Sequence, residues 1–120
     1  MLFKKNKKPK GRVICPIPVI IKILQAAVDG NEGMCEFVID LEGARHKLGL
    51  VSDFNRRQGF FDPIFYLDEH KFDTLEKFKA GAILGGQIFA ERSDQVEILD
   101  MDNGATKFPW HTFLESYVTP

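Results

Sequence analysis

The sequence predicts a single small α+β domain, with an antiparallel sheet of about five or six strands and two or three helices packed on one face. Short segments of alternating apolar and polar residues are separated by turn residues, and segments with helical spacing lie between and after them. Tight turns join the expected strands, in place of the long helical crossovers that parallel strands need. Eleven Phe residues and 44% hydrophobic content supply a core.

The first expected helix covers residues 18–29. Pro18 opens it and Gly30 follows its end, which is the asymmetry that helices favour. Its apolar residues recur at three- and four-residue spacing: Val19, Ile20, Ile23, Leu24 and Ala27. The β-branched start is also compatible with a strand, because a short apolar run is not assigned by period alone.

Three strands are expected next. In residues 35–41, alternation places Cys35, Phe37, Ile39 and Leu41 on one face. Residues 47–52 are the expected hairpin partner across the loop 42–45, and residues 63–67 form the third strand.

A second helix is expected over residues 74–80. Asp73 or Thr74 can cap it, Glu76 can complete a capping box with Asp73, and Gly81 marks its end. Strands are then expected at residues 87–91 and 96–101.

The C-terminal part begins with a turn and ends with a helix. Asn103-Gly104 favours a type I′ hairpin turn that leads into residues 106–108. Residues 109–118 predict an amphipathic helix opened by a proline, with apolar residues at helical spacing: Trp110, Phe113, Leu114 and Tyr117.

The chain divides into a basic N-terminal arm, residues 1–12, and one domain, residues 13–120, without internal repeats or linkers. The arm precedes an apolar run at 13–23, much as the charged start of a signal peptide precedes its apolar core. Pro16, Pro18 and Lys22 interrupt that run, no cleavage site follows, and it is too short to span a bilayer. We therefore expect a cytoplasmic protein with no membrane span.

Charge is divided unevenly along the chain. Residues 1–61 carry eleven Lys or Arg and six Asp or Glu, whereas residues 62–120 carry five and eleven, within a net charge of −1. Such asymmetry predicts electrostatic recognition of a charged partner, provided that the two sets of charges form separate surface patches.

No residue constellation predicts catalysis, a metal site or a cofactor. Cys15 and Cys35 have apolar neighbours and are expected to be buried thiols, although their spacing also permits a disulfide between them. The densest group of potential metal ligands is expected to be a charged loop before the second helix: Asp62, Asp68, Glu69 and His70. We expect no enzyme, and an enzyme using His70 with Asp62 or Glu69 is the third-ranked alternative.

The leading hypothesis is a protein-binding module whose acidic surface masks a basic partner. A bacterial immunity-type inhibitor of a toxin or nuclease has these requirements. The carboxylates would steer the encounter and an apolar centre would hold the complex. The expected contact residues are Asp94, Glu97, Asp100, Asp102, Asp68 and Glu69, with Trp110 and Phe61 as apolar anchors.

The alternative hypothesis is a protein that binds nucleic acid or another anionic surface. Its residues are those of the basic arm and of a loop that interleaves arginine with aromatic residues, a mixture typical of single-stranded nucleic-acid sites: Lys4, Lys5, Lys7, Lys8, Arg56 and Arg57. The sequence leaves the identity of the partner and the oligomeric state open.

Overall fold

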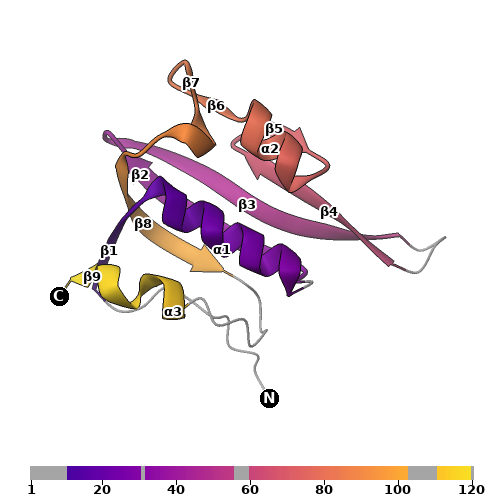
Figure 1. The fold of residues 1–120 in the computed structure, drawn as a ribbon, viewed down its shortest axis with the longest axis horizontal. Coiled ribbons are helices and arrows are strands. Elements are labelled where there is room, and N and C mark those ends of the chain that lie inside the picture. The colour runs from indigo at the N-terminus through magenta and orange to yellow at the C-terminus, as the bar shows by residue number, and fades with distance from the viewer. Residues whose placement is uncertain (1–10, 31, 56–59, 103–110, 120) are drawn as a thin grey trace.

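The computed structural model describes residues 11–30, 32–55, 60–102 and 111–119 of the 120-residue chain, with the backbone alone described at 53–55, 60–62, 111 and 112. Figure 1 shows the fold. The elements in chain order are β1 (Arg12–Pro16), α1 (Ile17–Asp29), β2 (Met34–Leu41), β3 (Ala44–Asn55), β4 (Phe60–Leu67), β5 (His70–Phe72), α2 (Leu75–Gly81), β6 (Ile83–Leu84), β7 (Gln87–Ile88), η1 (Phe89–Glu91), β8 (Gln95–Asp102), α3 (His111–Leu114), η2 (Glu115–Tyr117) and β9 (Val118–Thr119).

Seven strands form one antiparallel sheet in the order β5-β4-β3-β2-β8-β1-β9. The α+β class is therefore confirmed, and the sheet has more strands than the predicted five or six. The additional strands include β1 and the short edge strands β5 and β9. Strands β6 and β7 form a separate two-stranded hairpin.

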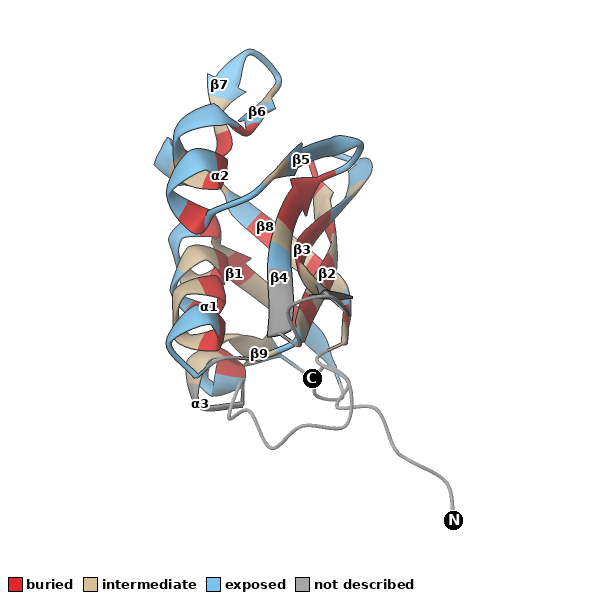
Figure 2. Cartoon of the chain, turned by 90° about the vertical axis from the view of Figure 1, so that its right-hand side faces the viewer, coloured by how far each residue is buried: buried red, intermediate tan, exposed pale blue. Residues whose placement is uncertain are grey.

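The described helices lie on one side of the sheet, and no described helix covers the other side, which we call the open side (Figure 2). Between the helices and the sheet lies the core, where α1 contributes Ile17, Ile20, Ile23, Leu24 and Ala27. The strands contribute alternate residues, so β2 buries its odd-numbered side chains from Cys35 to Leu41 and turns its even-numbered ones toward the open side. This alternation gives the sheet one apolar face, toward the helices, and one face of mixed polar and apolar side chains.

Both predicted helices of the first two-thirds of the chain are confirmed. Pro16 caps α1 and Pro18 lies in its first turn, while the Gly30 N–H donates to the Ala26 carbonyl at its end. In α2 the cap is Thr74, whose Oγ1 accepts a hydrogen bond of 3.0 Å from the Lys77 N–H. Asp73 does not cap the helix and instead forms an ion pair with Lys77.

The hairpin of β2 and β3 is longer than predicted. Glu42 and Gly43 have φ angles of 54° and 84°, so the chain reverses in two residues and β3 begins at Ala44. Positive φ at both central residues is the geometry that matches the twist of two paired strands.

Two later predictions differ from the structure. The expected strand at 87–91 ends after Ile88 and continues as the 3₁₀ helix η1. The expected C-terminal helix is also shorter, since α3 ends at Leu114, η2 follows, and the chain then adds β9 to the edge of the sheet. The expected turn at 103–108 lies outside the described residues.

Cys15 and Cys35 are free, buried thiols on β1 and β2, with β8 between their strands. Burial raises the pKa of Cys15 to about 11. Burial, assisted by the negative charges of Glu32 and Glu36, raises the pKa of Cys35 to about 12. Both thiols are therefore protonated core residues at neutral pH.

Candidate functional site on the open face of the sheet

Five carboxylates lie on the open face of the two central strands, and we call them the acidic ladder: Glu36 and Asp40 on β2, and Glu97, Asp100 and Asp102 on β8. The buried residues of β8 are Val96, Ile98 and Met101, so these acids alternate with core positions. The buried residues of both strands face the helices, which Figure 2 shows on one side of the sheet, so the ladder lies on the opposite side.

A β-bulge at Leu99 places the last two acids on the same face as Glu97. Val38 pairs with Asp100 and the next residue, Ile39, pairs with Ile98, so Leu99 is the extra residue in β8. Strict alternation from Ile98 would turn Asp100 toward the core. The bulge shifts the phase of the strand by one residue, as bulges do when they redirect side chains.

The register places like charges directly opposite each other. Glu36 on β2 pairs with Asp102 on β8, and Asp40 pairs with Glu97. Like charges at directly opposed positions of an antiparallel pair destabilise the sheet. In each of these two pairs the carboxylates repel each other across the strands.

Tyr66 reaches Glu36 across the intervening strand. Glu36, Gly49 and Tyr66 are in register on β2, β3 and β4, and the Tyr66 hydroxyl donates a hydrogen bond to Glu36 Oε2. Gly49 has no side chain to stand between them. Burial, together with this hydrogen bond, raises the pKa of Tyr66 above its ordinary value.

Basic side chains flank the ladder on both sides. Arg12 on β1 donates from Nε and Nη2 to the two carboxylate oxygens of Glu97, at 3.2 and 3.0 Å. This hydrogen bonding raises the pKa of Arg12. On the other side, Lys47 Nζ on β3 lies 3.8 Å from Glu36 Oε2. The open face thus carries a central acidic band with cations at its borders.

A hollow of about 190 Å³ lies within the ladder. Its polar lining comes from Glu36, Asp100 and Asp102, with Lys47 at one border. Val38 supplies apolar surface between the carboxylates. The hollow can accommodate a single cationic side chain, with apolar contact for its methylene stem and carboxylates for its charge.

Asp94, which the sequence placed in the acidic surface, has a structural partner. Arg92 is 8% exposed and donates from Nε to Asp94 Oδ1 at 2.8 Å, while its Nη1 donates to the Leu84 carbonyl at 3.0 Å. The hydrogen bond from Arg92 lowers the pKa of Asp94. Arg92 thereby links the β6–β7 hairpin to the start of β8.

Asp68 and Glu69 lie in the turn between β4 and β5 and are not part of the ladder. Asp68 has a φ of 53° and accepts hydrogen bonds from the Lys47 N–H at 3.0 Å and from His46 Nδ1 at 2.8 Å. Its carboxylate therefore holds this turn against β3. Glu69 is exposed beside it.

The remaining predicted site residues lie outside the described residues or have side chains that are not described. Phe61 is on β4, but only its backbone is described. The others are Trp110, Lys4, Lys5, Lys7, Lys8, Arg56 and Arg57. The nucleic-acid hypothesis depends on these basic residues and stays a prediction.

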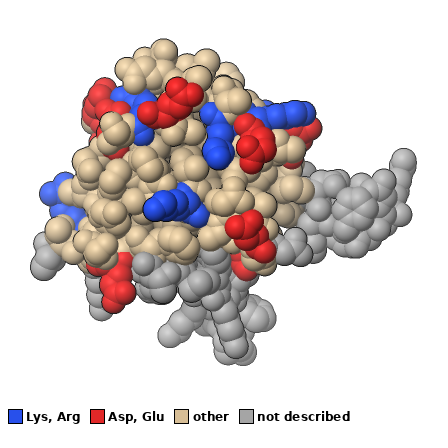
Figure 3. Space-filling view, viewed as in Figure 1, with Lys and Arg blue, Asp and Glu red and all other residues tan. Residues whose placement is uncertain are grey.

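The charge division of the sequence does not become a division of the described surface. Arg12 and Glu97, from opposite halves of the chain, form an ion pair. Glu36 and Asp40, from the basic half, join acids of the second half in the ladder. On the helix-covered face, Figure 3 shows basic and acidic side chains close together. Among the described residues, the ladder is a local concentration of one sign.

Sequence reasoning missed Glu36 and Asp40 as members of the site. Their signal was present, because both occupy outward positions of the most regular predicted strand. The sequence alone does not show the strand order. In the structure β8 lies beside β2, although some 60 residues separate them in the chain.

Among the described residues, no group of three or more His, Cys, Asp or Glu is arranged to hold a metal ion. None of the described helices has the length and apolarity to cross a membrane. Comparison of the chain with protein-family models, with curated proteins and with solved structures gave no match.

Proposed function

We propose that this protein is a non-catalytic binding protein that holds a basic surface of a partner protein against the acidic ladder. An immunity-type inhibitor, which masks a basic toxin or nuclease, is the biological role that fits this chemistry. The observation that carries the proposal is the pairing of Glu36 with Asp102 and of Asp40 with Glu97, acid opposite acid, on the open face of the sheet.

These pairs have a cost in the free protein. A like-charged cross-strand pair costs up to about 1 kcal/mol of stability, and the flanking cations Arg12 and Lys47 offset part of it. The core does not require the acids, because their side chains point away from it. Lysines or arginines of a partner would relieve the repulsion, so the cost would be recovered on binding.

The open face also offers apolar contact around the ladder. Half-buried apolar side chains lie on neighbouring strands in outward positions: Ile14 on β1, Val38 on β2, Val51 on β3 and Ile64 on β4. An interface of this type has an apolar centre that excludes water and charged groups that set orientation and association rate. The hollow at Val38 would hold one Lys or Arg of the partner.

The test is affinity capture with matched charge variants. Asp100→Asn/Asp102→Asn removes two charges from the ladder, and Glu76→Gln/Glu115→Gln removes two exposed charges from α2 and η2. We expect wild-type protein and the helix variant to capture the same basic protein from extract of the source organism. The purified partner should bind the ladder variant at least about tenfold more weakly, by calorimetry.

Salt gives an independent readout. Because exposed charges are screened, binding through the ladder should weaken as ionic strength rises. Equal affinities of the two charge variants, or a captured protein that is acidic, would contradict the proposal.

A further inference from the structure

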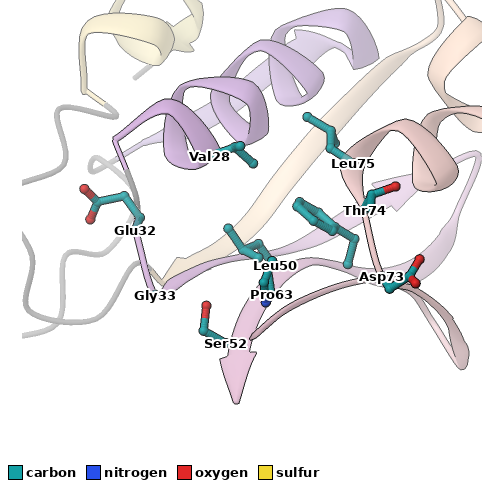
Figure 4. Close-up of a pocket in the computed structure, with 10 residues that line it drawn as sticks. Val28, Glu32, Gly33, Leu50, Ser52, Pro63, Asp73, Thr74 and Leu75 are labelled. Carbon is teal, nitrogen blue, oxygen red and sulfur yellow. The ribbon is translucent and has the colours of Figure 1, made fainter. Parts of the chain in front are cut away.

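A cavity of about 490 Å³ lies on the helix side of the sheet, away from the acidic ladder. Figure 4 shows it between the end of α1 and the start of α2, above β3 and β4. Its volume is within the range of small-molecule sites in proteins, about 300–1,000 Å³.

Apolar side chains line most of this cavity. Leu50, Phe65 and Leu75 belong to the main core, and Val28 and Pro63 complete the apolar wall. Leu50, Phe65 and Leu75 are at most 5% exposed, so the accessible apolar surface of the cavity is mainly that of Val28 and Pro63. An apolar group in the cavity would cover this surface and exclude water from it.

The polar groups of the cavity lie at its two ends (Figure 4). Glu32 and Ser52 are at one end, where the Ser52 N–H donates to the carbonyl of Gly33. Asp73 and Thr74 are at the other end, and each already binds Lys77. Within the described part of the chain, the Glu32 carboxylate and the Ser52 hydroxyl have no hydrogen bond or ion pair.

The charge at the rim of the cavity determines which charge a ligand can carry. No Lys, Arg or His is among the described residues that line the cavity, whereas two carboxylates are. Asp73 is paired with Lys77, so the carboxylate that would repel an anionic ligand such as a fatty acid is that of Glu32. An ammonium group at this end could pair with the Glu32 carboxylate, where it would keep contact with water.

We propose that this cavity binds a small organic cation with an apolar body and a primary ammonium group. The apolar body lies against Val28 and Pro63, over the buried Leu50 and Phe65, and the ammonium pairs with Glu32 at the rim. This site is independent of the acidic ladder, because the two are on opposite faces of the sheet.

Three indole compounds of similar size test the proposal: tryptamine, which is cationic; tryptophol, which is neutral; and indole-3-acetate, which is anionic. By calorimetry on the full chain, we expect tryptamine to bind about tenfold more tightly than tryptophol, because its ammonium adds a charge-assisted hydrogen bond. Indole-3-acetate should bind most weakly. Methyl NMR signals of Val28, Leu50 and Leu75 should shift on addition of tryptamine.

Matched variants locate the site. Val28→Trp would fill the mouth of the cavity and weaken tryptamine binding at least about tenfold, whereas Ile83→Trp on the β6–β7 hairpin would not. Both positions are exposed, at 39% and 57%, so neither change disturbs the core. Glu32→Gln should abolish the preference for tryptamine over tryptophol, and Glu76→Gln should keep it. Absence of tryptamine binding in the millimolar range, equal affinities for the three compounds, or indifference to Val28→Trp would overturn the proposal.

Discussion

Tyr66 on β4 donates a hydrogen bond to Glu36 on β2, across Gly49 of the strand between them. The bond fixes one carboxylate of the acidic ladder in position. It also joins three strands on the face that no described helix covers.

We expect Tyr66→Phe to lower the free energy of unfolding by about 1 kcal/mol, because a hydrogen bond to a partly buried charged group is lost. The measurement is urea unfolding at neutral pH. Tyr117→Phe is the control, since the Tyr117 hydroxyl has no hydrogen bond to another described residue. Equal effects of the two substitutions would show that the bond to Glu36 contributes no stability.

Among the described glycines, Gly49 is the position where an added Cβ would lie closest to backbone atoms. A Cβ there would lie 2.3 Å from the Cys35 carbonyl oxygen and 2.7 Å from Glu36 Cα, both backbone atoms, and the φ angle is +151°. We expect Gly49→Ala to destabilise the fold by about 3 kcal/mol or more, because β2 and β3 would have to separate.

Gly33→Ala is the matched control for this substitution. A Cβ at Gly33 meets no atom within 4 Å, so its effect on stability should be within about 1 kcal/mol. Thermal unfolding of both variants, followed by circular dichroism, gives the comparison. A Gly49→Ala protein as stable as the Gly33→Ala protein would refute the register assigned to β2 and β3.

The buried thiols predict a loss of stability at alkaline pH. In the unfolded chain they titrate near the ordinary value of 9.0, whereas in the fold their pKa values are about 11 for Cys15 and about 12 for Cys35. Between these values the native state binds more protons, so the free energy of unfolding falls as pH rises. The slope is at most about 1.4 kcal/mol per pH unit for each thiol.

The control for this pH dependence is Cys15→Ala/Cys35→Ala, which should be less stable overall but lose stability less steeply between about pH 9 and pH 11. Tyr66 adds to the fall in both proteins above about pH 10, because its pKa is also raised. Parallel curves for the two proteins would show that the thiols do not titrate differently in the fold.

Local patterns in the sequence predicted most helices and strands, because turn residues and apolar spacing within each segment determine its secondary structure. The alternation from Cys35 to Leu41 gives β2, and the proline at residue 18 with Gly30 gives α1. Strand β1 was missed because Val13 to Pro16 belongs to the same apolar run as the helix. Its pairing with β8 arises from a contact between residues about 80 positions apart.

The sequence predicted three of the five acids of the ladder, because only those three are close together in the chain. Glu97, Asp100 and Asp102 are close in sequence, and they were expected to act together. Glu36 and Asp40 join them only through the pairing of β2 with β8, and the bulge at Leu99 is needed to align the faces. The spacing of Val96, Ile98 and Met101, two residues and then three, is the local sign of that bulge.

The most direct test of the ladder as a binding surface is the footprint of the captured partner on the amide NMR spectrum of this protein. We predict that the largest chemical-shift changes fall on β2 and β8, around Glu36, Asp40 and Glu97, and that they diminish at high salt. Largest changes on α1 and α2, with β2 and β8 unaffected, would contradict the account.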